Sequence, residues 1–148
     1  MPSVRASEEF EIEAPQERCW IFFSDLANVG NCIPGCESVS PIDQVSAIFK
    51  IKLKVGYLSK TFELKAKVVE LTEPSHIAFT AEGTDAEIDG DLGFHRISPD
   101  KTGVRYTIEI RPISITGKTA VTMIGKDLVK QQASEFATCV KNKLQVRN

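Results

Sequence analysis

The clearest pattern in the chain is an alternation of apolar and polar residues between residues 47 and 68. In "AIFKIKLKV", Phe49 and Ile51 alternate with lysines, and "TFELKAKVVEL" continues the pattern with Phe62 and Leu64. Successive side chains of a strand point to opposite faces of a sheet. The pattern therefore predicts two neighbouring strands with one apolar face and one lysine-bearing face.

Four further segments carry strand signals: "ASEEFEIEA" near the start, and then "HIAFTAE", "EIDGDLGFHRIS" and "GVRYTIEIRPIS". The connections "TEPS" and "SPDKTG" are short and rich in turn residues, which predicts antiparallel pairing of neighbours. Gly90 and Gly93 interrupt the alternation of the third of these segments. We expect a β-bulge at that point.

Helical signals lie on both sides of the strand region. Pro15 suits the first position of a short helix, and Ser24 or Asp25 suits the N-cap of a second one that ends near Gly30. The last thirty residues return to a period of 3.6, which predicts one long helix. Its apolar stripe comprises Val121, Ile124, Leu128, Phe136, Val140 and Leu144.

These elements predict an α+β helix-grip fold in a single domain over residues 1–148. A curved antiparallel sheet of about six or seven strands wraps around the long C-terminal helix, and two short helices follow the first strand. Packing between a curved sheet and one helix is hard to complete, so we expect an apolar cavity there. The candidate lining residues are Trp20, Phe49, Ile51, Phe62, Phe79, Phe94, Tyr106, Ile124 and Leu128.

Composition narrows the function classes. The chain is 42% apolar and 26% charged with a net charge of −2, which argues against nucleic acid as the main partner. No window reaches the roughly 20 apolar residues of a membrane span, and the N-terminal residues have no apolar run typical of a signal peptide. The four cysteines are therefore expected to be reduced thiols in the cytoplasm.

The segment "NCIPGCE", residues 31–37, is the strongest local motif. Zinc would need further ligands, and no second pair is visible, so we expect no metal and no cofactor. A redox pair would favour C-x-x-C at a helix N-terminus, and a disulfide between Cys32 and Cys36 is conceivable but disfavoured in a cytosol. The favoured interpretation is a type II turn, with Pro34 and Gly35 at its centre and two buried thiols flanking it.

The block "APQERCWIFFSDLANVGNCIPGCESV" resembles CoxG, a family named for a subunit of carbon monoxide dehydrogenase, within the START/Bet v 1-like (SRPBCC) helix-grip superfamily. The resemblance rests most on Cys32, Pro34, Gly35, Cys36 and Glu37. It implies an accessory or maturation protein of a molybdenum hydroxylase, with a cavity for a lipid-like or quinone-like molecule. Longer members carry a C-terminal extension thought to reach the membrane, so peripheral membrane contact stays open here.

Three functions follow from these observations. The first is non-enzymatic binding of an apolar small molecule in the cavity. The second is a small enzyme of the cyclase or dehydratase kind, which would need a polar group such as His95, Arg96 or Tyr106 inside the cavity. The third is a protein-docking module that uses the outward lysines, Lys50, Lys52, Lys54, Lys65 and Lys67.

Overall fold

A computed structural model describes the backbone of residues 3–55 and 58–145, and the side chains in these ranges except those of Val55, Leu58 and residues 123–127. The element order confirms the predicted strand, two short helices, strand series and terminal helix. In chain order the elements are β1 (Val4–Ile12), α1 (Gln16–Phe23), α2 (Leu26–Gly30), β2 (Cys36–Pro41), β3 (Ser46–Val55), β4 (Leu58–Thr72), β5 (His76–Glu82), β6 (Ala86–Ser98), β7 (Lys101–Pro112) and α3 (Ile115–Leu144).

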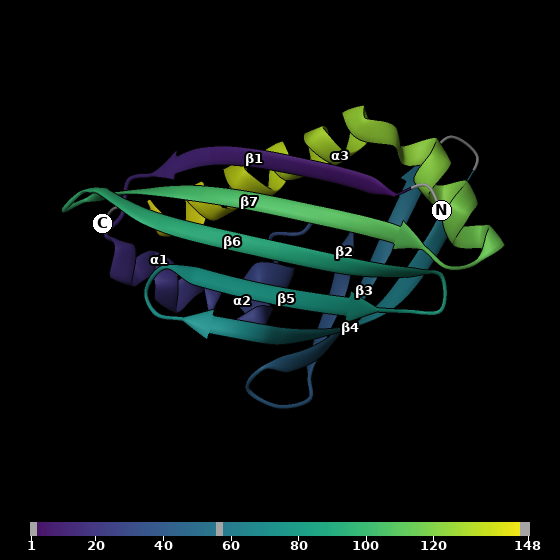
Figure 1. The fold of residues 1–148 in the computed structure, drawn as a ribbon, viewed down its shortest axis with the longest axis horizontal. Helices are drawn as coiled ribbons and strands as arrows, with labels where there is room; N and C mark the ends of the chain where they lie inside the picture. The colour runs from purple at the N-terminus through teal and green to yellow at the C-terminus, as the bar shows by residue number, and fades with distance from the viewer. Residues whose placement is uncertain (1–2, 56–57, 146–148) are drawn as a thin grey trace.

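The described strands form one antiparallel sheet in the order β1-β7-β6-β5-β4-β3-β2. β1 pairs with β7, so the first and the last strand lie side by side. Figure 1 shows β2 and β3 running steeply across the molecule behind β5, β6 and β7, which reveals the curvature of the sheet. The alternation predicted for β3 and β4 is present, because Phe49 and Leu64 are buried while Lys50 and Lys65 are exposed.

The short helices and the turn after them follow their local sequence. Asp25 caps α2 by accepting a hydrogen bond from the Ala27 N–H at 2.9 Å. The Ile33 carbonyl then accepts from the Cys36 N–H at 3.1 Å, and Gly35 has φ of 84°. With Pro34 between them, this is the predicted type II turn.

One sheet prediction was wrong. The β5–β6 register runs without a break through Gly90 and Gly93, and the irregularity in β6 falls later, between Arg96 and Ser98. Gly90 serves close packing instead of a bulge. A Cβ atom there would lie 2.0 Å from the ring of Phe79, so only glycine leaves room for that aromatic side chain.

The long helix α3 has 30 residues and is therefore about 45 Å long. Ser114 caps it by accepting a hydrogen bond from the Gly117 N–H at 2.9 Å. Figure 1 shows α3 passing behind β1 and β7. Its C-terminal half is packed into the main core through Phe136, Val140 and Leu144.

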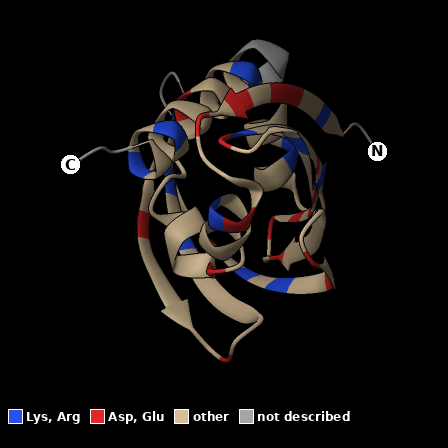
Figure 2. Cartoon of the chain, turned by 90° about the vertical axis from the view of Figure 1, so that its left-hand side faces the viewer, with Lys and Arg blue, Asp and Glu red and all other residues tan. Residues whose placement is uncertain are grey.

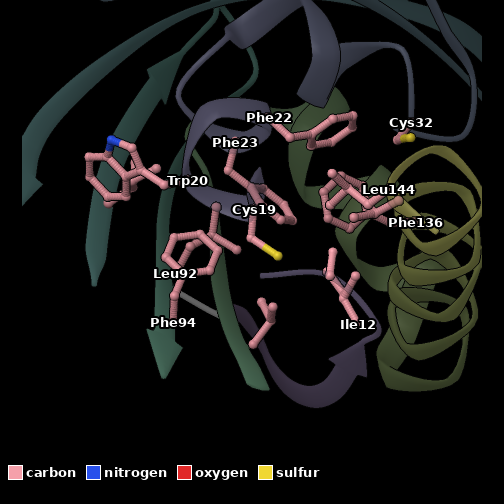
Figure 3. Close-up of a cluster of buried hydrophobic side chains, with 14 residues drawn as sticks. Ile12, Cys19, Trp20, Phe22, Phe23, Cys32, Leu92, Phe94, Phe136 and Leu144 are labelled. Atoms are coloured by element: carbon pink, nitrogen blue, oxygen red, sulfur yellow. The ribbon is translucent and has the colours of Figure 1, made fainter. Parts of the chain in front are cut away.

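The main core gathers side chains from α1, β6 and α3. In Figure 3, Cys19 and Phe23 of α1 lie among Leu92, Phe94 and Phe136, with Ile12 on the adjoining strand end. The ring centroids of Phe23 and Phe94 are 5.1 Å apart. This dense packing fixes one end of α3 against the sheet.

Charged residues of both signs are interspersed along the ribbon in Figure 2. Cross-strand pairs account for several of them, such as Arg105 with Glu9 at 2.7 Å and Arg111 with Asp89 at 2.6 Å. The outward face of the sheet is thus a mixed ionic surface, while the concave face is apolar.

Candidate functional site

The first half of α3 packs against β1 and β7 through Val121 and Val129, and two neighbouring hollows lie between the concave face of the sheet and the helices. Counting the parts that open to solvent, they hold about 1040 and 900 Å³. They share seven lining residues, and the two hollows together are called the cavity from here on. The shared residues are Ile33, Ile51, Leu64, Ile88, Tyr106, Ile108 and Phe136.

The larger hollow lies beside the N-terminal half of α3 and is bordered by Ile33 and Pro34 of the turn after α2. Ala120, Val121, Leu128 and Val129 line it from the helix. The smaller hollow extends toward α1 and α2, and Phe23, Leu26 and Val29 line it there. The cavity therefore extends from the start of α3 to the short helices α1 and α2.

Six of the predicted lining residues border the cavity. Ile51 and Tyr106 line both hollows, Phe62 and Leu128 line the larger one, and Phe49 and Phe79 line the smaller one. Their positions agree with the predicted inward facing of their elements.

Two other predicted lining residues lie elsewhere. Trp20 and Phe94 belong to the main core, where their rings meet edge to face with centroids 6.2 Å apart. Phe94 is enclosed by packed side chains, whereas Trp20 also borders a separate hollow beside α1 and α2. The side chain of a third, Ile124, lies outside the described residues.

Sequence reasoning did not select several residues that border the cavity. Ile88, Ile108 and Phe136 are the main ones. Ile108 has the same strand parity as Tyr106, and Phe136 belongs to the apolar stripe of the helix. Strand parity and the helical stripe show which face of an element is apolar. They do not show whether that face packs against the opposite element or borders a cavity.

Tyr106 is the main polar feature of the cavity. Its ring packs against that of Phe136, with centroids 5.6 Å apart and planes inclined by 38°. Burial raises the pKa of the Tyr106 hydroxyl to about 12, because ionisation in an apolar surrounding is unfavourable. The side chain therefore keeps its proton at neutral pH and can donate a hydrogen bond.

The remaining polar candidates do not reach the cavity. His95 and Arg96 are exposed on β6. The second histidine, His76, is also on the outer surface, where its Nδ1 lies 2.5 Å from Glu70 and its Nε2 contacts Asp91. Among the described residues, no group of three or more His, Cys, Asp or Glu side chains is arranged to hold a metal ion.

The turn "CIPGC" contributes both structure and lining. Ile33 lines both hollows and Pro34 lines the larger one. At Gly35 an added Cβ would lie 2.3 Å from the Lys52 carbonyl oxygen, and the Lys52 amide donates to the Gly35 carbonyl at 2.8 Å. The turn is thus locked onto β3 at the wall of the cavity, and the residue that follows Cys36, Glu37, is exposed.

The expectation that all four cysteines are free thiols was wrong in this structure. Cys32 forms a disulfide with Cys139 of α3, and Cys19 and Cys36 are free. The pairing spans 107 residues, so local spacing gave no sign of it. Cys36 is half-buried, and that burial raises the pKa of its thiol, as expected for a weakly reactive cysteine.

Lys50, Lys52 and Lys54 lie exposed on the outer face of the sheet, as predicted. Lys50 is 4.0 Å from Glu63. None of the helices in the described ranges is both long and apolar enough to cross a membrane.

Comparison with protein families gives one match that covers most of the chain. The model of the CoxG family, described as a carbon monoxide dehydrogenase subunit, matches residues 9–145. No curated protein matches the chain significantly in sequence.

Solved structures share the fold at low sequence identity. A conserved protein from Geobacillus kaustophilus superposes with a TM-score of 0.79 at 18% identity, covering 96% of this chain and 95% of that one. A START superfamily protein from Mycobacterium smegmatis gives 0.72 at 13% identity, with 95% and 97% coverage. The ZhuI aromatase/cyclase from Streptomyces sp. R1128 gives 0.72 at 12% identity, with 97% and 94% coverage. These similarities confirm the START-like helix-grip fold.

Proposed function

The chain belongs to the CoxG family, and from that premise we propose that it is a non-enzymatic binding protein that holds an apolar small molecule beneath α3. The observation that carries this proposal is the cavity itself. Apolar hollows with few polar groups are the usual form of small-molecule sites, and the described lining here is almost entirely apolar.

The lining supports an apolar ligand. Strands β3, β4, β6 and β7 supply aliphatic and aromatic side chains, including Ile51, Leu64 and Ile108, and α3 supplies Val121 and Leu128. Removing apolar surface from water contributes roughly 25 cal/mol per Å². A ligand that buries itself here would thus gain most of its binding free energy from the hydrophobic effect.

An enzyme of the cyclase kind is the second candidate, because an aromatase/cyclase shares this fold. Acid–base chemistry would need a group that exchanges a proton near neutral pH. Among the described lining residues, Tyr106 is the one ionisable side chain, and its pKa of about 12 leaves it protonated. It can donate a hydrogen bond but cannot act as the base, so binding is the better supported function.

The partner we propose is a molybdenum hydroxylase of the carbon monoxide dehydrogenase kind, or one of its maturation proteins. The support is the family description, which names a subunit of that enzyme. A docking face for such a partner would be the exposed Lys50, Lys52 and Lys54. Reversing the charge of these three lysines should then abolish the pull-down of the partner enzyme by this protein. An unchanged pull-down would show that this face does not bind the partner.

The location we propose is the cytoplasm. The disulfide between Cys32 and Cys139 would be unusual there, so its state in cells tests the proposal. Cytosolic thiols are normally kept reduced, whereas disulfides persist in oxidising compartments. Trapping thiols with a maleimide reagent inside intact cells should show whether Cys32 and Cys139 are joined there. A fully oxidised pair in cells would contradict the cytoplasmic location and favour an oxidising compartment.

Mass spectrometry of protein purified without detergent tests the binding function. We expect a non-covalent complex in the native spectrum, with an organic molecule that is released on denaturation. Protein that carries nothing and also binds no added apolar probe would contradict the proposal.

A further inference from the structure

Tyr106 stands at the junction of the two hollows. It projects from β7 on the concave side of the sheet and lines both of them. The ring of Phe136 on α3 packs against it at 5.6 Å between centroids. The phenol is thus held between the sheet and the helix at the centre of the cavity.

The hydroxyl of Tyr106 has no hydrogen-bond partner among the described residues. Among the described residues, no side-chain nitrogen or oxygen is both fully enclosed by protein and unpaired. The Tyr106 hydroxyl is unpaired, so it cannot be fully enclosed, and we infer that it is exposed to the cavity. Buried phenol groups normally find a partner, so this one has a donor to offer to a ligand.

The rest of the lining narrows the chemistry of that ligand. Besides Tyr106, Gln132 of α3 is the one described lining residue with a polar side chain, and it borders only the larger hollow. No Lys, Arg, His, Asp or Glu appears among the lining residues whose side chains are described. An anion or a cation placed here would lose its hydration without gaining a counter-charge, which is strongly unfavourable.

We propose that Tyr106 is a specificity-determining residue, whose hydroxyl donates a hydrogen bond to a carbonyl or hydroxyl oxygen of an uncharged, mostly apolar ligand. This inference rests on the proposed binding function and names the class of ligand that the cavity prefers. A carboxylate or phosphate group inside the cavity would find no counter-charge among the described lining residues. A pure hydrocarbon would bind more weakly, because it leaves the phenol unpaired.

Three naphthalene derivatives of similar shape test the inference: 2-acetylnaphthalene has a carbonyl, 2-isopropenylnaphthalene replaces that oxygen with a methylene, and 2-naphthoate is an anion. Each competes against the uncharged fluorescent probe N-phenyl-1-naphthylamine, whose emission rises in apolar surroundings. The variant Tyr106→Phe removes the hydroxyl and keeps the ring. The matched control, Thr107→Val, removes the hydroxyl of the next residue, which faces outward and pairs with Ser7 at 3.0 Å.

In the wild type and in Thr107→Val, we expect the ketone to bind more tightly than the alkene. Tyr106→Phe should reduce that preference by about 2- to 10-fold, which corresponds to one net hydrogen bond. Naphthoate should bind at least about tenfold more weakly than the ketone. The alkene should bind Tyr106→Phe at least as tightly as the wild type, because the variant has no hydroxyl to leave unpaired, and this binding also shows that the variant is folded.

Two outcomes would overturn the inference while leaving the binding function intact. One is an unchanged preference for the ketone in Tyr106→Phe, and the other is naphthoate binding as tightly as the ketone. If neither the fluorescent probe nor any neutral naphthalene binds the wild type, the binding function itself fails. The two failures are therefore distinguishable in the same titrations.

Discussion

Cys32 and Cys139 are joined by a disulfide although 107 residues separate them in the chain. Their Cα atoms lie 5.4 Å apart, where the loop after α2 meets the last third of α3. Ile33 and Pro34, which follow Cys32 directly, line the cavity. The bond therefore ties the wall of the cavity to the helix that covers it.

Loss of this disulfide should destabilise the fold substantially. Closing so long a loop restricts the unfolded chain, and removal of a native disulfide typically costs about 2–5 kcal/mol. We expect Cys139→Ser to lower the free energy of unfolding by that amount in denaturant titrations without reductant. In the presence of reductant, wild type and variant should unfold alike.

Cys36→Ser is the matched control for that comparison, because Cys36 is a free and half-buried cysteine in the same motif. It should change the free energy of unfolding by less than about 1 kcal/mol. Thiol titration of the denatured, unreduced wild type should count the two free cysteines, Cys19 and Cys36. A count of four would contradict the disulfide.

Gly35 should tolerate no side chain. Its φ of 84° is unfavourable for other residues by about 1–2 kcal/mol, and an added Cβ would meet the Lys52 carbonyl oxygen at 2.3 Å. We predict that Gly35→Ala lowers the free energy of unfolding by more than about 1 kcal/mol. Gly93→Ala is the control, because nothing lies within 4 Å of a Cβ at that position; equal effects of the two substitutions would refute the account of the turn.

The His76 ion pair should make stability depend on pH. Hydrogen bonding to Glu70 raises the pKa of His76 in the folded protein, and the same contact lowers the pKa of Glu70. The pKa of histidine in the unfolded chain is about 6.5. Because the pKa of His76 is higher in the folded protein, the ion pair contributes its full stability below that pH and loses it as the pH rises through the folded-state pKa of His76. Conversely, the stability that Glu70 contributes is lost as the pH falls through its lowered folded-state pKa.

We therefore expect the melting temperature of the wild type to fall between about pH 6 and pH 8 by more than that of His76→Gln. The effect should be modest, because the pair is on the surface and is screened by salt. His95→Gln removes an exposed histidine outside the pair and should keep the wild-type slope. A His76→Gln protein with an unchanged slope would show that the pair does not contribute.

Much of the fold was predictable because its signals are local. Alternation of Phe49 and Ile51 with lysines defines a strand and its two faces, and Asp25 and the Pro34–Gly35 pair mark a helix start and a turn. The structure confirms each of these features. Each signal lies within a few residues, where chain geometry alone determines the outcome.

The finer layout of the cavity was less predictable, for a physical reason. Periodicity shows that Phe94 and Phe79 face inward, but it does not show that side chains of α1 pack against Phe94 while Phe79 borders the cavity. The disulfide has the same cause, since the path of α3 alone brings Cys139 to Cys32. Gly90 also interrupts the alternation without a bulge, because its role is to make room for Phe79 on the next strand.

The central claim is that the space beneath α3 binds an apolar molecule, and a cavity-filling variant tests it most directly. Ala120 lines the larger hollow, whereas Ile115 on the same helix is 87% exposed and lies outside the cavity. N-phenyl-1-naphthylamine should bind wild type and Ile115→Phe alike. In folded Ala120→Phe its affinity should fall at least about tenfold, because the added ring occupies the site. Equal affinity for all three proteins would contradict the claim.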